Sequence, residues 1–263
     1  EWAWVLAHGR RLEHMQRVCD WAEWDRYVDL EGIMMHRDSS ERVLTPFQLT
    51  KGPFSMDALL LLSQAEAVKK QPTPVPQVEE ENLPAALQPG PLRVGFLWIG
   101  TYESEFANNV ITVLEELQKD ARIETFWLAL NEEGSEEEPG LYDTRRRTSA
   151  LFGQRLVHYR TDPERVNHQE GAGVAGAMRG LRLHTVVNLP GWLNEASMSV
   201  SAGVPAVHQA SFKGYAGTLG ASFVQHLITD HISSPPELSQ LYSEKLVYMP
   251  KTYYPVANAA TAR

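Results

Sequence analysis

The residues best suited to chemistry in this sequence lie in one loop of small residues, Lys213-Gly-Tyr-Ala-Gly-Thr218. A lysine beside flexible backbone could neutralise a phosphate, the Thr218 hydroxyl could donate a hydrogen bond, and free N–H groups suit an anionic group. Gly214 and Gly217, with Gly220 just beyond, let the backbone approach a ligand or turn sharply because they carry no Cβ. The same residues also suit a structural corner with an exposed lysine. The loop therefore predicts either a ligand site or a tight turn.

Motifs for several other chemistries are absent from the sequence. No Gly-x-Gly-x-x-Gly fingerprint occurs in Leu97-Trp-Ile-Gly-Thr-Tyr-Glu103, and the chain has no P-loop, no zinc-binding His/Cys spacing and no Gly-x-Ser-x-Gly nucleophile elbow. We predict no metal site. His184 lies inside a predicted strand and is interpreted as a satisfied core or rim histidine. His208, His226 and His231 share no spacing, so the catalytic residues stay unknown.

Composition narrows the class of protein. The 263 residues carry a formal net charge of −9, which argues against a nucleic-acid partner. The tight basic run Arg145-Arg146-Arg147 predicts a solvated helix face. No apolar run approaches the roughly 20 residues that span a bilayer, so we expect no membrane partner. The single cysteine, Cys19, excludes an internal disulfide framework and fits a reducing compartment. The residues at both ends lead us to expect a piece of a longer chain.

Three blocks follow one another along the sequence. Residues 1–70 predict helices, with Ser55 as the N-cap of a helix over Met56–Val68. Residues 71–91 predict a linker, because their repeated prolines can continue neither a helix nor a strand ladder. Residues 92–263 alternate between apolar strand patterns and helical patterns.

This third block predicts an α/β fold with a doubly wound, mostly parallel sheet. Ligands bind such sheets beyond the carboxyl ends of the strands, which places Asn188–Trp192, Ser211–Gly220 and Asp230 at one edge. Three segments are predicted to be helices, namely Val110–Leu117, the region around Arg145 and a segment that begins at Asp162. The predicted strands are Leu92–Trp98, Ile123–Leu130, Leu156–Tyr159, Leu183–Leu189, Ala206–Gln209, Gln225–Thr229 and Leu246–Tyr248.

Several segments resemble the nucleocytoplasmic protein O-GlcNAc transferase family. Gln209–Gly220 is similar to the family pattern Q-A-x-x-x-G-Y-P-G-T-x-G, and Ile228–Asp230 begins a stretch similar to I-T-D-x-x-x-S-P. Tyr242–Pro250 is similar to Y-S-E-K-L-x-Y-M-P, and Asn188–Trp192 keeps the family's N-x-x-G-[YW] strand end. Val18–Tyr27 resembles the C-D-W segment that leads from the family's tetratricopeptide superhelix into its catalytic region.

The resemblance implies that residues 92–263 are the Rossmann-like first lobe of a two-lobe (GT-B type) glycosyltransferase, and that residues 1–70 end a tetratricopeptide region. It implies transfer of N-acetylglucosamine from UDP-GlcNAc to Ser or Thr of intracellular proteins, with inversion and with neither a cofactor nor a required metal. The implied location is cytoplasmic, nuclear or both. The implied partners are the nucleotide sugar, protein or peptide acceptors, and a second lobe of the same chain. That lobe holds most of the nucleotide in the family, so the present region alone is expected to be inactive.

Carried over residue by residue, the resemblance also implies a substrate-binding set. Two positions come from the strand end and five from the loop: Asn188, Gly191, Lys213, Gly214, Tyr215, Gly217 and Thr218. Ala216 stands where the family has proline, and Lys213 stands where the animal enzymes carry an apolar residue.

One family motif is missing. The family's S-x-D-F-x-x-H-P pattern corresponds to Trp98–Ala107 here, which contains neither its His nor its Asp. Two alternatives therefore stay open. The chain could belong to a non-catalytic relative that binds peptides or acts as a scaffold, or to a related protein O-fucosyltransferase.

Overall fold

The computed structural model describes residues 45–50, 54–71, 90–99, 105–131, 144–160, 178–204 and 208–256. The helices predicted before residue 45, most of the predicted linker and the helix predicted from Asp162 lie outside these described residues.

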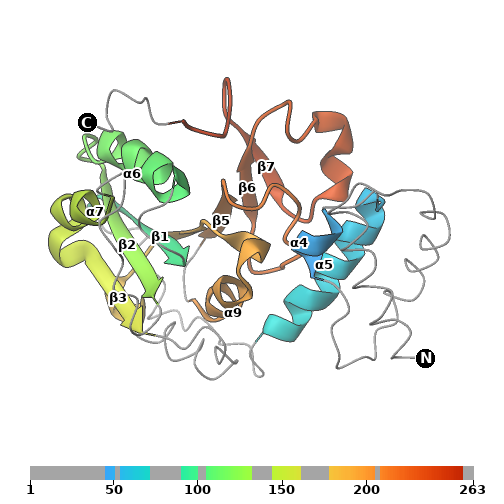
Figure 1. Ribbon diagram of the computed structural model, residues 1–263, viewed down its shortest axis with the longest axis horizontal. Coiled ribbons are helices and arrows are strands. Elements are labelled where there is room, and N and C mark those ends of the chain that lie inside the picture. The colour runs from blue at the N-terminus through green and yellow to red at the C-terminus, as the bar shows by residue number, and fades with distance from the viewer. Residues whose placement is uncertain are drawn as a thin grey trace.

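The centre of the molecule is a seven-stranded sheet with the order β3-β2-β1-β4-β5-β6-β7 (Figure 1). Every neighbouring pair of strands is parallel. The strands are β1 Leu92–Ile99, β2 Ile123–Asn131, β3 Leu156–Arg160, β4 Thr185–Asn188, β5 His208–Phe212, β6 His226–Thr229 and β7 Lys245–Tyr248. The predicted α/β class with a doubly wound parallel sheet is confirmed, and the fold is Rossmann-like.

Helices cover both faces of this sheet. Helices α6 and α7 lie on one face and α9 on the other, while α4 and α5 lie beside the β6–β7 end (Figure 1). The α-helices are α4 Pro46–Leu49, α5 Met56–Lys70, α6 Glu105–Leu117, α7 Thr144–Phe152 and α9 Glu195–Gly203. Short 3-10 helices complete the described part, namely η2 Gly153–Arg155, η3 Arg179–Leu181, η4 Gly191–Leu193 and η5 Pro236–Leu241.

Alternation along β1 and β2 sends side chains into two cores. Phe96, Trp98 and Trp127 point to the face under α6 and α7, where they pack with Ile111 and Phe152. The other face carries a second core beneath α9, made by Leu97, Phe126, Leu128, Leu130, Met178, Leu183, Val186, Val200 and Val204. Strands buried on both faces explain why β1 and β2 appear in the sequence as near-continuous apolar runs.

Two predicted strands have wrong boundaries. The predicted strand Leu183–Leu189 is too long, because β4 runs only from Thr185 to Asn188. The predicted strand Ala206–Gln209 ends too early, because β5 continues to Phe212. Its last residues pair with both neighbours, Ser211 with Asn188 and Phe212 with Ile228. A polar, small residue such as Ser211 suggests a loop in the sequence, yet here it is fully buried in the ladder.

Helix α5 confirms the predicted cap and packs against the end of the sheet. The Ser55 side chain accepts a hydrogen bond from the Ala58 N–H (3.1 Å), as expected of an N-cap. On its buried face, Ala67 joins a third core with Trp192 and Tyr215. The helix that precedes the proline-rich stretch is therefore packed directly onto residues that follow β4 and β5.

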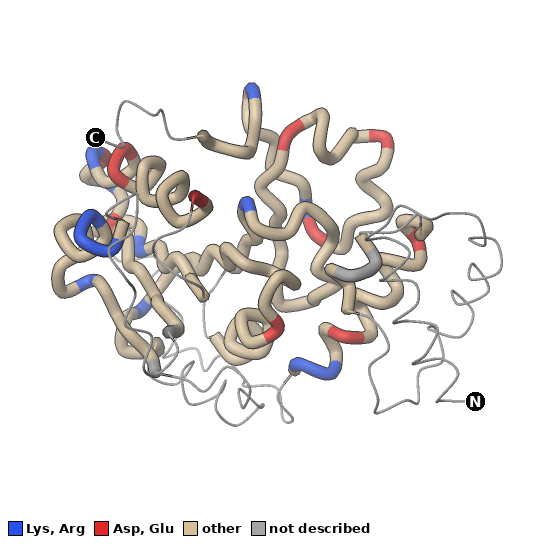
Figure 2. The backbone as a smooth tube through the Cα atoms, in the orientation of Figure 1, with Lys and Arg blue, Asp and Glu red and all other residues tan. Residues whose placement is uncertain are grey.

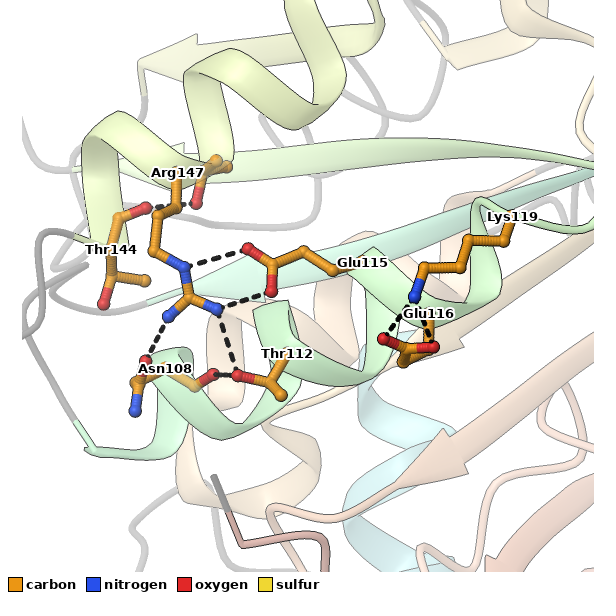
Figure 3. A network of polar contacts seen from close by, with 8 residues as sticks. Asn108, Thr112, Glu115, Glu116, Lys119, Thr144 and Arg147 are labelled. Carbon is orange, nitrogen blue, oxygen red and sulfur yellow. Dashed lines mark hydrogen bonds and ion pairs between the residues drawn. The ribbon is translucent and has the colours of Figure 1, made fainter. Parts of the chain in front are cut away.

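The basic run in α7 behaves differently from its prediction at one position. Arg145 and Arg146 are exposed, but the Arg147 side chain is only 19% exposed and reaches α6 (Figure 3). It donates to both Glu115 oxygens (2.9 and 2.7 Å), to Thr112 Oγ1 (3.1 Å) and to Asn108 Oδ1. Arg147 thus joins two helices rather than facing water. Elsewhere, acidic and basic residues are interspersed along the described chain (Figure 2).

Replacement of Arg147 by alanine should lower the free energy of unfolding by about 1 kcal/mol, because a two-pronged, half-buried ion pair with extra hydrogen bonds is lost. Lys119→Ala is the control. It removes the Lys119–Glu116 pair, whose side chains are 69% and 71% exposed, and should change stability by less than about 0.5 kcal/mol. Urea denaturation measures both, and equal losses would contradict the structural role of Arg147.

Candidate functional site

The strand order reverses beside β1, between the β1–β2–β3 half and the β4–β7 half of the sheet. In doubly wound sheets this switch point, at the carboxyl ends of the strands, is where ligands bind. Three segments meet there, namely the start of α6 after β1, residues 189–191 after β4 and residues 213–220 after β5. The loop singled out in the sequence is therefore located where the fold class places ligand sites.

Gly214 fits the loop against the end of β4. Its N–H donates to Leu189 O (3.0 Å) and to Phe212 O (3.0 Å). A Cβ added at Gly214 would lie 2.2 Å from Leu189 O, a distance that Cβ atoms essentially never show, and 3.0 Å from Pro190 O, which is also tight. Glycine is required here by the close approach of two backbones, which is a structural role independent of any ligand.

Asn188 and Gly191 build the turn after β4. Asn188 Oδ1 accepts from the Gly191 N–H (2.7 Å), and Asn188 Nδ2 donates to Ser201 Oγ (2.8 Å) in α9. Gly191 has a φ of +56°, and a Cβ there would lie 2.8 Å from Tyr215 Cβ. Asn188 is fully buried. The turn is therefore held by internal contacts, and substrate contact by either residue stays a prediction.

Tyr215 and Gly217 pack the middle of the loop against α4. Tyr215 is buried, and its hydroxyl donates to Pro46 O at 3.4 Å. Burial raises the pKa of Tyr215. A Cβ at Gly217 would lie 2.8 Å from the Tyr215 hydroxyl, so the glycine leaves room for the folded-back ring. The tyrosine side chain faces the interior in this arrangement.

Thr218 is fixed by a buried carboxylate that the sequence reasoning missed. Its hydroxyl donates to Glu244 Oε2 (2.9 Å) and accepts from the Ser243 N–H (3.1 Å), while Glu244 Oε1 accepts from the Leu219 N–H (2.7 Å). Burial raises the pKa of Glu244, and the hydrogen bonds from Thr218 and Leu219 act in the opposite direction. Glu244 belongs to the Tyr242–Pro250 motif, so the motif itself was the signal that pointed to it.

Lys213 is the unusual member of the loop. It has a φ of +75°, a left-handed conformation that costs a non-glycine residue about 1–2 kcal/mol. Only 2% of the residue is exposed. Its Nζ lies 3.8 Å from the centre of the Tyr254 ring and 4.8 Å from that of Phe106, and has no hydrogen-bond acceptor among the described residues. The exposed lysine of the structural-corner alternative is therefore not observed, because Lys213 is buried.

Burial lowers the pKa of Lys213 to about 8, and attraction to Glu105 offsets part of the decrease. Nothing in the local sequence pairs Lys213 with Phe106 or Tyr254, because these residues come from the start of α6 and from the segment after β7. Only the fold brings the three side chains together.

Asp230 holds the segment that carries Tyr254. Asp230 Oδ1 accepts from the Ile232 (2.9 Å) and Ser233 (2.8 Å) N–H groups, and Oδ2 accepts from the Tyr253 N–H (2.9 Å). The hydrogen bonds from the Ser233 and Tyr253 backbone lower the pKa of Asp230 to about 2. Asp230 lies at the predicted edge of the sheet, but its carboxylate is satisfied by backbone groups.

The structure also bears on the histidine and on the metal-binding groups considered in the sequence. His184 Nδ1 accepts from the Arg93 N–H (3.0 Å), which confirms its interpretation as a satisfied histidine. Within the described ranges, no group of His, Cys, Asp and Glu side chains is arranged to hold a metal ion. None of the described helices is long and apolar enough to cross a membrane.

The region that contains this site is similar to a known protein family. Residues 167–260 match the sequence model of the family described as Glycosyl transferase family 41. This stretch contains the turn after β4, the 213–220 loop and the Glu244 motif. Residues 167–260 are therefore similar to the Glycosyl transferase family 41 domain.

Two named proteins are similar in sequence to all or part of this chain. The chain is 26% identical over 257 residues to the Arabidopsis thaliana protein named "Probable UDP-N-acetylglucosamine–peptide N-acetylglucosaminyltransferase SEC", which covers 92% of this chain and 24% of that protein. It is 38% identical over 72 residues to the Caenorhabditis elegans UDP-N-acetylglucosamine–peptide N-acetylglucosaminyltransferase, covering 27% of this chain and 6% of the relative. The chain thus spans about a quarter of the length of these relatives or less.

A solved structure shares the fold. It is a mutant O-GlcNAc transferase from Thermobaculum terrenum, which superposes with a TM-score of 0.59 at 17% identity and covers 89% of this chain and 45% of that chain. The match extends beyond the family 41 domain to most of the described helices and strands. At this identity it shows a common architecture.

Gly214→Ala should lower the free energy of unfolding by about 2–3 kcal/mol, because its Cβ would overlap Leu189 O. Gly180→Ala is a matched control, since a Cβ at Gly180 meets nothing within 4 Å, and it should change stability by less than about 0.5 kcal/mol. Urea denaturation decides between them. A Gly214→Ala protein as stable as wild type would mean that the two backbones do not approach as described.

Acid should weaken the Asp230 tether. A carboxyl whose folded pKa of about 2 lies below its unfolded value of about 3.9 contributes stability that is complete above the unfolded value and is lost as pH falls toward 2. Between pH 5 and pH 2, the wild type should therefore lose stability more steeply than Asp230→Asn. Asp230→Asn should also be cleaved faster by trypsin after Lys251, because the Tyr253 N–H loses the carboxylate oxygen that accepts its hydrogen bond. If both proteins lose stability equally with falling pH and are cleaved at the same rate, Asp230 does not hold this segment.

Proposed function

We propose that residues 92–263 form the first Rossmann-like lobe of a two-lobe glycosyltransferase that moves N-acetylglucosamine from UDP-GlcNAc to Ser or Thr hydroxyls of proteins. The observation that carries the proposal is the family 41 match over residues 167–260, which includes the segments that follow β4 and β5 at the carboxyl edge of the sheet. In this proposal, a second lobe of the same chain supplies most of the nucleotide contacts, and transfer proceeds with inversion and without a metal.

The named relatives support the choice of donor and acceptor. Both bear the name UDP-N-acetylglucosamine–peptide N-acetylglucosaminyltransferase, and this chain spans only a fraction of each. Transfer between a nucleotide sugar and a hydroxyl requires both to be positioned and the departing diphosphate to be stabilised. A tetratricopeptide region before the lobe and a cytoplasmic or nuclear location belong to the same proposal.

The lobe's own part in the proposal is to shape the sugar side of the site. The backbone of the 213–218 loop lies over the switch point, held there by Gly214 against β4 and by Thr218 on Glu244. Asn188, Gly191, Tyr215 and Gly217 then act through the shape of this loop, since their side chains or Cα atoms face inward. Lys213 brings the one charged group of the loop to this place.

A non-catalytic, peptide-binding relative is the second candidate. Two observations favour it, namely the absence of the motif's His and Asp in Trp98–Ala107 and the engagement of Asn188 and Thr218 in internal hydrogen bonds. In that case the lobe has kept its scaffold while the residues that act on a substrate have changed.

UDP release by the full-length protein on a Ser/Thr-rich peptide separates the candidates. The proposed transferase should release UDP from UDP-GlcNAc only when the peptide is present, and Lys213→Ala should lower turnover. GDP-fucose tested in parallel covers a related fucosyltransferase. Peptide binding without release from either donor would reject the transferase and favour the peptide-binding module.

A further inference from the structure

The amine of Lys213 occupies an electrostatically unfavourable position. It is buried between the Phe106 and Tyr254 rings, which attract a cation through their faces but offer no hydrogen-bond acceptor. Glu105 attracts the amine through space, yet no carboxylate of the described residues lies within hydrogen-bonding distance of it. A buried ammonium without a paired anion is among the costlier arrangements in a protein.

A second positive feature lies at the same place. Phe106, whose ring lies 4.8 Å from the amine, is the second residue of α6, a helix of 13 residues that begins at Glu105. The N-terminus of a helix carries a partial positive charge, so a cation there is the disfavoured partner and an anion the favoured one. The helix start therefore adds a partial positive charge near the Lys213 amine, while the Glu105 carboxylate in the same turn carries the opposite charge and attracts the amine without a hydrogen bond to it.

The backbone at Lys213 adds a third cost. A φ of +75° suits glycine, and an apolar side chain would bury without a charge penalty. The chain instead carries a lysine at this position. Its left-handed backbone, its burial and its proximity to a helix start each cost free energy. Such a combination is expected where a charged group acts on something other than the protein itself.

We propose that Lys213 Nζ and the first turn of α6 form a binding site for an anionic oxygen group, a phosphate or a carboxylate, at the carboxyl edge of the sheet. Tyr254, which is 39% exposed, covers this site from the segment tethered by Asp230. The site itself follows from the geometry alone. The statement that the anionic group belongs to a nucleotide sugar rests on the proposed function.

Inorganic phosphate tests the site without any reference to catalysis. At a phosphate concentration ten times its Kd, the melting temperature of the wild-type protein should rise by about 3–6 °C over a chloride control of equal ionic strength. Lys213→Met, which keeps a side chain about as long as the lysine stem and removes the amine with its charge, should abolish this rise. Lys251→Met is the control, since Lys251 is exposed in the nearby segment, and it should respond as the wild type does.

A rise of the same size in Lys213→Met, or no rise in the wild type, would overturn the site. A second measurement covers a Lys213→Met protein that does not fold. In the wild type with ¹³Cε-labelled lysine, phosphate should raise the pKa reported by the Lys213 resonance, because a bound anion stabilises the ammonium. An unchanged Lys213 titration in saturating phosphate would overturn the proposal equally.

Nucleotide ligands identify the source of the anion in the full-length protein. If the anion is the diphosphate, Lys213→Met should weaken UDP binding by about tenfold or more. If it is a substituent of the sugar, the variant should leave UDP and UDP-GlcNAc unchanged and weaken UDP-glucuronic acid by a similar factor. Phosphate binding through Lys213 without binding of any nucleotide sugar would keep the anion site and reject the proposed function. Unchanged affinity for all of these ligands, phosphate included, would reject the site.

Discussion

The contact between Gly214 and the end of β4 is the constraint on which the candidate site depends. The Gly214 N–H reaches Leu189 O, and a Cβ would lie 2.2 Å from that oxygen. This contact lays the loop after β5 across the switch point of the sheet instead of letting it extend away from it. The positions of Lys213 before it and of Tyr215 after it follow from this single close approach.

Several braces then fix the loop along its length. Thr218 and Leu219 are held by the buried carboxylate of Glu244, and the Trp192 indole donates to Leu219 O at 2.9 Å. The far end is equally tight, since a Cβ at Gly220 would meet the backbone of Ser63 and Gln64 in α5 at 2.2–2.3 Å. A loop held by three elements is rigid enough to present backbone groups and one charge in fixed positions, which is what preorganised binding needs.

The sequence predicted what depends on local patterns. Apolar runs located β1, β2 and the remaining strands, and Ser55 marked the start of α5. Two predictions failed where the environment of a side chain comes from distant segments. Arg147 reads as one of three solvated arginines until α6 is packed beside it, and Lys213 reads as exposed until Phe106 and Tyr254 close over it.

The features of the candidate site also differ in whether local sequence patterns could predict them. Its expected location followed from the glycines and from the alternation of strand and helix patterns, because both can be recognised in neighbouring residues. The inward orientation of Tyr215 and the engagement of Thr218 by Glu244 did not follow, since each partner lies in a different element. The seven positions carried over by resemblance remain a prediction as substrate contacts.

The packing of α5 on the loop has a consequence for how such sequences can diverge. Ser63, Gln64 and Ala67 touch residues 215–224, although the proline-rich stretch of residues 72–89 separates them in the sequence. Substitutions on the buried face of α5 should therefore appear in step with changes near Gly220. Evolutionary covariation would then link two segments that a reader of the sequence would assign to different regions.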